Sequence, residues 1–284
     1  MNTDFTRYLR PSELSVALAT LAAAPRVVLA GGTDLYATGT PVPPKLRQAV
    51  LDITSIEGLR GIRMDRAEVV VGATATWADV RAANLPIWFR GLKQAASQVG
   101  GAQIQNVATV AGNLCNASPA ADGTPPLLAL SALIDLACAR GARTVALEEF
   151  VLGPRRTLCA ADELVTAVRI PVRSSHARSV FYKLGARSFL VISIVSIAVT
   201  VDFDPNGRIC YAGLAVGSCA ERPRRLRSLE SRLQGLDRTA AREMPIPEEI
   251  PEISPIDDIR GTAAYRRDVL VTLLQRALRE VCGG

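Results

Sequence analysis

Three apolar segments that follow one another in the second half of the sequence constrain the fold most strongly. They span residues 180–184, 191–203 and 209–216, and each has the composition expected of a β-strand. Residues 204–207 between the last two segments (Asp-Pro-Asn-Gly) are typical of a tight turn. Because short turns join neighbouring antiparallel strands, we expect these segments to form an antiparallel meander.

The remaining segments mix helical and strand-like patterns, which predicts an α+β protein. We expect further strands at residues 26–30, 49–53, 59–63, 69–72, 133–139, 144–147 and 164–170. We expect helices that begin near Pro11, Thr76, Arg90 and Pro125 and that cover residues 222–242 and 262–281. Residues 100–114 are expected to form a long polar loop, and the polar stretch 173–178 is expected to separate two domains.

The chain has few side chains suited to acid–base or metal chemistry. His176 is the only histidine among 284 residues, which argues against catalytic triads and multi-histidine metal sites. Six cysteines are present, but no two have C-x-x-C spacing, so we expect no metal centre in this chain. If the protein is an enzyme, a bound cofactor is therefore expected to carry the reaction.

The charge and the chain start bear on partners and location. The net charge of +6 permits an acidic partner or a phosphate-bearing ligand without requiring either. The arginine-rich residues 222–242 fit a solvated helix face or, alternatively, a docking surface for partner subunits. We expect no secretory signal at residues 1–4, which have no basic segment followed by an apolar one, and the longest apolar stretch, residues 189–201, is too short to cross a membrane. We therefore expect a cytoplasmic protein.

Two segments carry most of the information about function. Residues 28–35 (Val-Leu-Ala-Gly-Gly-Thr-Asp-Leu) read as a strand that ends in two glycines, where backbone N–H groups can turn toward phosphate oxygens. Residues 109–122 combine small residues with Asn, Ser and Asp side chains, an inventory that suits a pyrophosphate and a ribitol or ribose chain. Each segment alone has a simpler reading, as a plain turn and as a surface loop that caps helices.

Taken together, the two segments resemble the paired flavin loops of the FAD-binding subunits of the molybdenum hydroxylases, the xanthine dehydrogenase family. The resemblance continues through residues 162–165, 170–171 and 182–187 and ends at residues 260–267 (Arg-Gly-Thr-Ala-Ala-Tyr-Arg-Arg). It implies a two-part PCMH-type FAD-binding domain at residues 1–175, with subdomains of about 1–57 and 58–175. A smaller C-terminal α+β domain with an antiparallel sheet and helices is implied at residues 176–284.

The resemblance also implies which residues bind the cofactor, position by position. The implied contacts of a non-covalent FAD are Val28, Leu29, Ala30, Gly31, Gly32, Thr33, Asp34, Leu35, Thr109, Val110, Ala111, Gly112, Asn113, Asp122, Val165 and Lys183. Gly31, Gly32 and Thr33 fall nearest the pyrophosphate, and Asp122 falls at an FAD hydroxyl. Val165 and Lys183 fall near the flavin ring, with Val99 at a further contact position. No catalytic residue or metal ligand is implied in this chain.

The function implied by the resemblance is that of an electron-transfer subunit in a heteromeric molybdenum hydroxylase. Electrons would arrive from [2Fe–2S] clusters in a small partner subunit and leave through FAD to an external acceptor. The molybdenum cofactor would belong to a large partner subunit, in a heterotrimer or its dimer, without nucleic acid or a membrane span. Purines, aldehydes, carbon monoxide and N-heterocycles remain open as substrates of such a complex.

Some features of the sequence leave other readings open. Ala111 stands where the family often has glycine, which requires a negative φ at that residue. Residues 188–192 include none of the acidic residues that some NAD-reducing relatives carry, so the electron acceptor stays open. Lys183 could also be a plain exposed lysine on a strand. The alternatives for the whole chain are a self-sufficient PCMH-type flavin oxidoreductase and a basic nucleic-acid-binding protein that uses the arginine-rich stretch.

Overall fold

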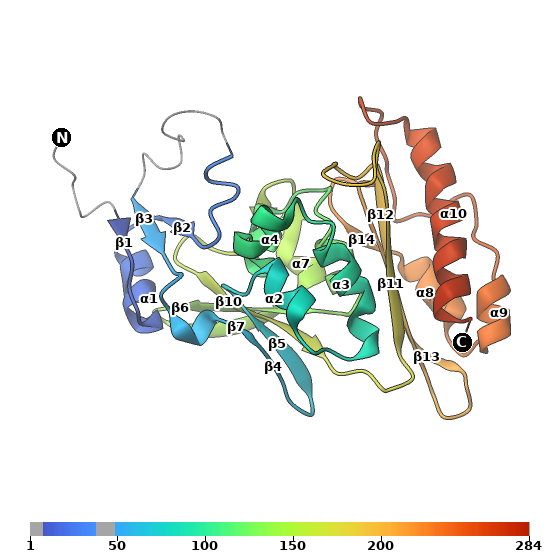
Figure 1. Ribbon diagram of the computed structural model, residues 1–284, viewed down its shortest axis with the longest axis horizontal. Coiled ribbons are helices and arrows are strands. Elements are labelled where there is room, and N and C mark those ends of the chain that lie inside the picture. Colours follow the sequence, from blue (N-terminus) through green and yellow to red (C-terminus); the bar gives the residue numbers. More distant parts are fainter. Residues whose placement is uncertain (1–7, 38–48, 284) are drawn as a thin grey trace.

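The computed structural model describes residues 8–37 and 49–283. The chain start, on which the expectation about a secretory signal rests, lies outside these described residues. Figure 1 shows an elongated arrangement in which a small N-terminal sheet, a central sheet with helices and a C-terminal sheet with helices follow one another along the long axis. The α+β fold class predicted from the sequence is confirmed.

The N-terminal part is a small parallel sheet with one helix. Its elements are β1 (Tyr8–Leu9), α1 (Leu14–Ala23), β2 (Val27–Leu29) and β3 (Val50–Asp52), and the strand order is β1-β3-β2. Strand β3 is buried along its whole length and pairs with both neighbours. The end of β2 is therefore fixed at the sheet edge, and the glycine-containing turn begins there.

The central part is a five-stranded sheet of order β4-β5-β10-β6-β7 whose pairs are all antiparallel. Its strands are β4 (Ile62–Met64), β5 (Glu68–Gly72), β6 (Leu133–Cys138), β7 (Gly141–Ala146) and β10 (Leu164–Pro171). Its helices are α2 (Trp77–Ala82), α3 (Arg90–Ala96), α4 (Ala102–Val107), α5 (Val110–Asn116), α6 (Thr124–Ala129) and α7 (Leu147–Phe150). A short hairpin of β8 (Val151–Gly153) and β9 (Arg156–Thr157) follows α7, and two 3-10 turns, Glu57–Leu59 and Ile87–Phe89, complete this part.

The predicted antiparallel meander is confirmed in the C-terminal part. Its sheet has the order β11-β12-β13-β14, with β11 (Arg178–Leu184), β12 (Val195–Phe203), β13 (Ile209–Gly217) and β14 (Arg224–Arg225). The helices are α8 (Arg227–Leu233), α9 (Arg238–Glu243) and α10 (Ala263–Val281). Helix α10 begins where the sequence predicts, because the Thr262 hydroxyl accepts a hydrogen bond from the Tyr265 N–H and caps it.

Strand β12 is buried at every position, so both faces of the C-terminal sheet are covered. Helices α3 and α6 of the central part pack against this sheet, and so do α8 and α10 of the C-terminal part. Figure 1 shows α3 and α10 on opposite sides of β11 and β12. Phe181, Ala198 and Ala215 of this sheet therefore join the hydrophobic core of the central part. The two parts share a packed boundary rather than a loose linker.

Two expectations from the sequence are wrong. Residues 100–114 are not a loop but contain α4 and most of α5, because Gly101 and Thr109 each begin a short helix. The stretch 222–242 is not one helix but contains β14, α8 and α9. Several of its arginines are exposed, whereas the Arg225 side chain is 4% exposed and forms an ion pair with Glu230 at 2.8 Å. Some of these arginines also hold the C-terminal part to the central part, for example Arg227, which contacts Glu148 at 2.5 Å.

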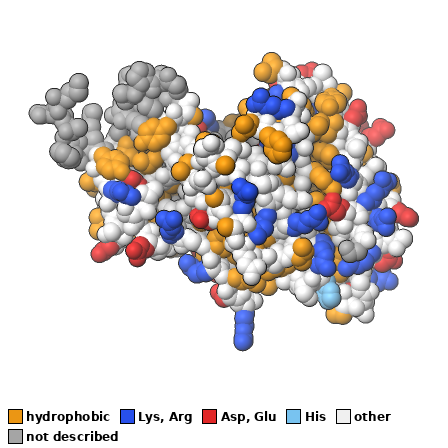
Figure 2. All heavy atoms as spheres, in the orientation of Figure 1, with side chains coloured by type: hydrophobic (Ala, Val, Ile, Leu, Met, Phe, Trp, Pro, Cys, Tyr) orange, Lys and Arg blue, Asp and Glu red, His pale blue; other side chains and the backbone are white. Residues whose placement is uncertain are grey.

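The surface shows how the positive charge is distributed. Figure 2 shows Lys and Arg side chains spread over the visible face rather than gathered in one stripe. Among the residues that the structure describes, no three His, Cys, Asp or Glu side chains gather as a metal site would require. No helix within residues 8–37 and 49–283 is long and apolar enough to cross a membrane.

Candidate functional site

The glycine-containing turn after β2 lies directly against the chain that precedes α5. A Cβ placed on Gly31 would lie 2.0 Å from the carbonyl oxygen of Val107 and 2.9 Å from Cα of Ala108. Only glycine allows this approach of two backbones. Gly32 follows with φ of +71°, a left-handed conformation that also favours glycine. Gly31 therefore lies against Val107 and Ala108, directly before the second segment at residues 109–122.

Other residues of the first segment anchor this turn. Leu29 and Leu35 are buried and pack with Val50, while Val28 and Ala30 pack against the central core. Thr33 is half-buried, and the Asp34 carboxylate lies 3.3 Å from the Arg155 guanidinium. The apolar members of the segment thus anchor the turn to the small N-terminal core and to the central core.

The second segment is a helix start rather than a flexible loop. The Thr109 hydroxyl accepts a hydrogen bond from the Gly112 N–H at 3.0 Å and caps α5. The Val110 N–H donates to the carbonyl oxygen of Ala75 at 3.0 Å, which ties the helix start to the loop after β5. Val110 and Ala111 are buried, and Ala111 has the negative φ of a helical residue, so alanine fits here in place of glycine.

Asp122 and Lys183 form a buried ion pair between the central and C-terminal parts. The Lys183 ammonium lies 2.5 Å from a carboxylate oxygen of Asp122, and the two side chains are 5% and 9% exposed. Lys183 is therefore not the exposed strand lysine that the sequence also allowed. The Ser193 hydroxyl donates to the other carboxylate oxygen. Burial raises the pKa of Asp122, although Lys183 and Ser193 both favour its charged form.

A cavity of about 410 Å³ opens beside this ion pair. It is lined by Gln98, Val99, Gly100, Asn113, Asn116, Ser118, Ala120, Ala121, Asp122, Leu190, Val191 and Ile192. The Oδ1 atoms of Asn113 and Asn116 are buried and have no hydrogen-bond partner among the described residues. A buried acceptor of this kind requires a donor, which hydroxyl groups of a ligand would supply.

Apart from Val99, only Asn113 and Asp122 of the predicted FAD contacts line this cavity. Residues 28–35, residues 109–112 and Lys183 lie outside its lining, and so does Val165. It lies in β10, is 5% exposed and packs in the central core, and Leu136 of β6 is its partner in the sheet. A register shift follows it, between Val165 and Ala167. Val99, in contrast, lines the cavity as the resemblance implies.

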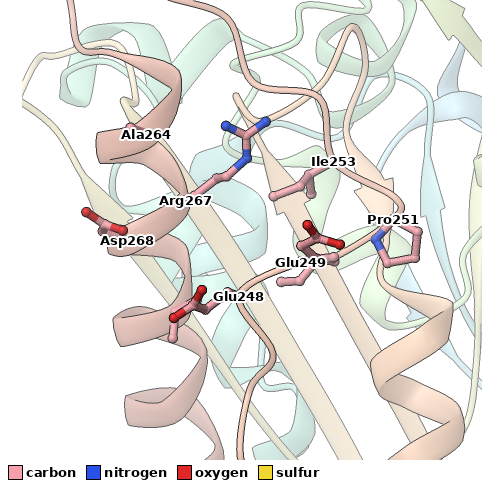
Figure 3. Close-up of a pocket in the computed structure, with 9 residues that line it drawn as sticks. Glu248, Glu249, Pro251, Ile253, Ala264, Arg267 and Asp268 are labelled. Atoms are coloured by element: carbon pink, nitrogen blue, oxygen red, sulfur yellow. The ribbon is translucent and has the colours of Figure 1, made fainter.

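A larger cavity of about 1080 Å³ lies elsewhere, between α10 and residues 248–253. Figure 3 shows Arg267 extending from α10 toward the side of the segment that carries Glu248, Glu249 and Ile253, whereas the Asp268 side chain points away from that segment. None of the residues predicted to contact FAD lines this cavity. It is therefore separate from the site formed by the two segments.

Sequence reasoning missed Ser193, Asn116 and Arg260 as members of the site. Ser193 lies inside an apolar stretch, and a hydroxyl that interrupts such a stretch is the one signal that could have singled it out. Asn116 lies in the second segment, but its inward direction follows from α5, which the sequence did not predict. Arg260 reaches the site only through the tertiary fold, by donating to the carbonyl oxygen of Ser193.

Comparison with known proteins defines the class of this chain. Residues 3–173 match the family described as FAD binding domain in molybdopterin dehydrogenase, and residues 180–281 match the CO dehydrogenase flavoprotein C-terminal domain. The protein is thus an FAD-binding oxidoreductase component. The chain belongs to the FAD-binding medium subunits of the molybdopterin dehydrogenase family, as the resemblance implied.

Individual relatives agree with this assignment. The chain is 34% identical over 217 residues to the nicotinate dehydrogenase FAD-subunit of Eubacterium barkeri, covering 74% of this chain and 72% of the relative. It is 30% identical over 285 residues to the carbon monoxide dehydrogenase medium chain of Afipia carboxidovorans, covering 95% and 94%. A solved carbon monoxide dehydrogenase from Hydrogenophaga pseudoflava superposes with a TM-score of 0.83 at 25% identity, covering 98% of this chain and 97% of that one.

Proposed function

We propose that this subunit binds FAD without a covalent bond, between the turn at Gly31 and the start of α5, and transfers electrons within a heteromeric molybdenum hydroxylase. In this role FAD would accept electrons from [2Fe–2S] clusters of a small partner subunit and release them to an external acceptor. The large partner subunit would carry the molybdenum cofactor and oxidise the substrate. The chain's own residues would bind and orient the cofactor.

The observation that carries the proposal is the contact of Gly31 with the carbonyl oxygen of Val107. It places two small-residue segments side by side, although they are far apart in the sequence. Backbone at Gly31 and Gly32 has no side chain that would keep a pyrophosphate away. The segments 28–35 and 109–113 would then hold the phosphates and the sugar chains.

The polar groups beside the cavity suit the rest of the cofactor. The unpartnered Oδ1 atoms of Asn113 and Asn116 would accept hydrogen bonds from hydroxyl groups. Asp122 would accept another, and Lys183 would exchange part of its contact with Asp122 for the flavin ring. Val165 would support the site from the central core, where it packs in β10, rather than line the cavity itself. A non-covalent complex fits, because His176, the one histidine of the sequence, lies outside both segments.

The test of the assembly begins with a tagged full-length chain isolated from its native host with its partners. We expect a large chain with molybdenum and a small chain with iron and acid-labile sulfide to co-purify with it. Substrate of the complex should bleach the flavin absorbance in the assembly but not in the isolated chain. Substrate oxidation by the isolated chain would instead favour the self-sufficient flavin oxidoreductase.

A further inference from the structure

Residues 185–194 connect β11 to β12 and line the cavity through residues 190–192. Near the end of this connection, basic side chains hold three carbonyl oxygens that would otherwise need other donors. The three bonds run from Lys183 Nζ to Val191 O at 2.7 Å, from Arg260 Nη1 to Ser193 O at 3.2 Å and from Arg266 Nη1 to Ile194 O at 2.9 Å. Side chains therefore fix this wall of the cavity in place.

The two arginines are held by one carboxylate. Asp258 accepts hydrogen bonds from the Arg260 backbone N–H at 2.8 Å and from its guanidinium at 2.6 and 3.0 Å. The other guanidinium, of Arg266, is 1% exposed and donates to Asp258 at 2.6 Å and to the carbonyl oxygen of Ser218 at 2.8 Å. Asp258 therefore orients both guanidinium groups toward the connection before β12.

Ser193 joins this arginine pair to the buried ion pair. Its carbonyl oxygen accepts from Arg260, and its hydroxyl donates to Asp122. The residue is fully buried, so neither bond can be replaced by bulk water without local opening. Arg260 thus lies two hydrogen bonds away from the carboxylate that Lys183 contacts.

We infer that Arg260 is a positioning residue of the flavin site, acting through Ser193 on Asp122. This inference rests on the proposed function, because Asp122 is the group proposed to bind an FAD hydroxyl. Among the described residues, the Arg260 guanidinium forms hydrogen bonds with Asp258 and Ser193 rather than with residues 190–192 or Asp122. This guanidinium donates a hydrogen bond to the Ser193 carbonyl oxygen and so fixes the backbone of that residue. The Ser193 hydroxyl then points at Asp122 and fixes the orientation of the Asp122 carboxylate. Loss of the guanidinium would free the Ser193 backbone, and the Asp122 carboxylate would then be held less firmly in one orientation.

The experiment compares full-length wild type with Arg260→Ala, Arg260→Lys and Arg267→Ala. Arg267 is the matched control, because it is an exposed arginine on α10 that lines the other cavity. FAD affinity is measured by flavin fluorescence, and the environment of the ring by the visible absorption and circular dichroism of bound FAD. We expect Arg260→Ala to weaken FAD binding about tenfold and to shift the visible dichroism, as loss of a charge-assisted hydrogen bond would. Arg260→Lys should restore part of the affinity, and Arg267→Ala should match wild type.

A double-mutant cycle separates positioning from a general loss of structure. If Arg260 acts through Ser193, the affinity loss of the Arg260→Ala, Ser193→Ala double variant should be smaller than the product of the two single losses. Independent losses, or an Arg260→Ala variant with wild-type affinity and spectrum, would overturn the inference. If Arg260→Ala does not fold, the same cycle is run with Arg260→Lys. Wild type that binds no FAD would instead overturn the proposed function, so the two failures are distinguishable.

Discussion

The Lys183 ammonium and the Asp122 carboxylate lie 2.5 Å apart and join the two parts of the molecule across 61 residues of sequence. Lys183 also donates to the carbonyl oxygen of Val191, so the ion pair and the cavity wall form one unit. Removing one partner of a buried ion pair leaves an uncompensated charge. The proposed flavin site and the boundary between the parts should therefore respond to the same substitutions.

Lys183→Met should lower the free energy of unfolding at pH 7 by about 3 kcal/mol, because Asp122 loses its counter-charge. Urea unfolding followed by circular dichroism measures this change. Arg140→Met is the matched control, because it removes an ion pair of similar length, 2.6 Å, whose arginine side chain is 74% exposed. We expect little or no change in that control.

The decrease in the free energy of unfolding caused by Lys183→Met should be larger at high pH than at low pH. Burial raises the pKa of Asp122 above its ordinary value of 3.8, and the loss of Lys183 raises it further. A raised carboxyl pKa means that the folded state prefers the protonated form, so stability falls as pH rises through the folded-state pKa. The difference between variant and wild type should thus be smaller near pH 4 than at pH 7. An equal difference at both pH values would contradict the buried charge.

Gly31→Ala should destabilise the protein by about 1 to 3 kcal/mol, because the new Cβ would meet the backbone of Val107 and force it to move. The same substitution should weaken FAD binding, since it separates the two segments. Gly58→Ala provides the control, because a Cβ there has no neighbour within 4 Å. Thermal unfolding and FAD titration of both variants check the prediction, and equal behaviour of the two would show that the contact at Gly31 has no such role.

Asp258 should contribute to stability only while it is ionised. The guanidinium of Arg260 lowers the pKa of Asp258 from 3.8 to about 2, chiefly by hydrogen bonding to the carboxylate. A lowered pKa stabilises the fold above the unfolded-state value, and this contribution is lost as pH falls from 3.8 toward 2. Asp258→Asn should therefore show a weaker loss of stability over that range than wild type, as measured by unfolding at several pH values.

The buried cysteines should be slow to react in the native protein. Burial raises the pKa of the Cys219 thiol to about 12 and that of Cys282 to about 11, so little thiolate is present at pH 8. Cys210 is exposed and should be modified before either of them by a thiol reagent. Mass spectrometry after timed alkylation checks the order, and rapid native modification of Cys219 would contradict the packing described for the C-terminal core.

Much of the fold follows from local sequence patterns, whereas much of the site depends on distant contacts. The meander around residues 195–217 and the cap at Thr262 are readable because their signals are local. Helices α4 and α5 are only six and seven residues long, too short for periodicity to reveal them. The burial of Arg225 depends on its pairing with Glu230, and no pattern of charges along the chain distinguishes it from a solvated arginine.

The cofactor residues divide in the same way. Gly31 and Gly32 could be predicted from the sequence, because a close approach of two backbones or a positive φ requires glycine. The roles of the Ser193 hydroxyl and the Arg260 guanidinium could not be predicted, since they depend on how the segments before β12 and α10 bring Ser193 to Asp122 and Arg260 to Ser193.

The most direct test of the account is FAD titration of the purified full-length chain after removal of any bound flavin. We predict that the chain takes up one equivalent of FAD, with quenched flavin fluorescence, and that acid or urea releases all of it because the complex is non-covalent. The Gly31→Ala variant should retain less FAD than the Gly58→Ala variant under the same conditions. A folded wild-type chain that takes up no FAD would contradict the central claim.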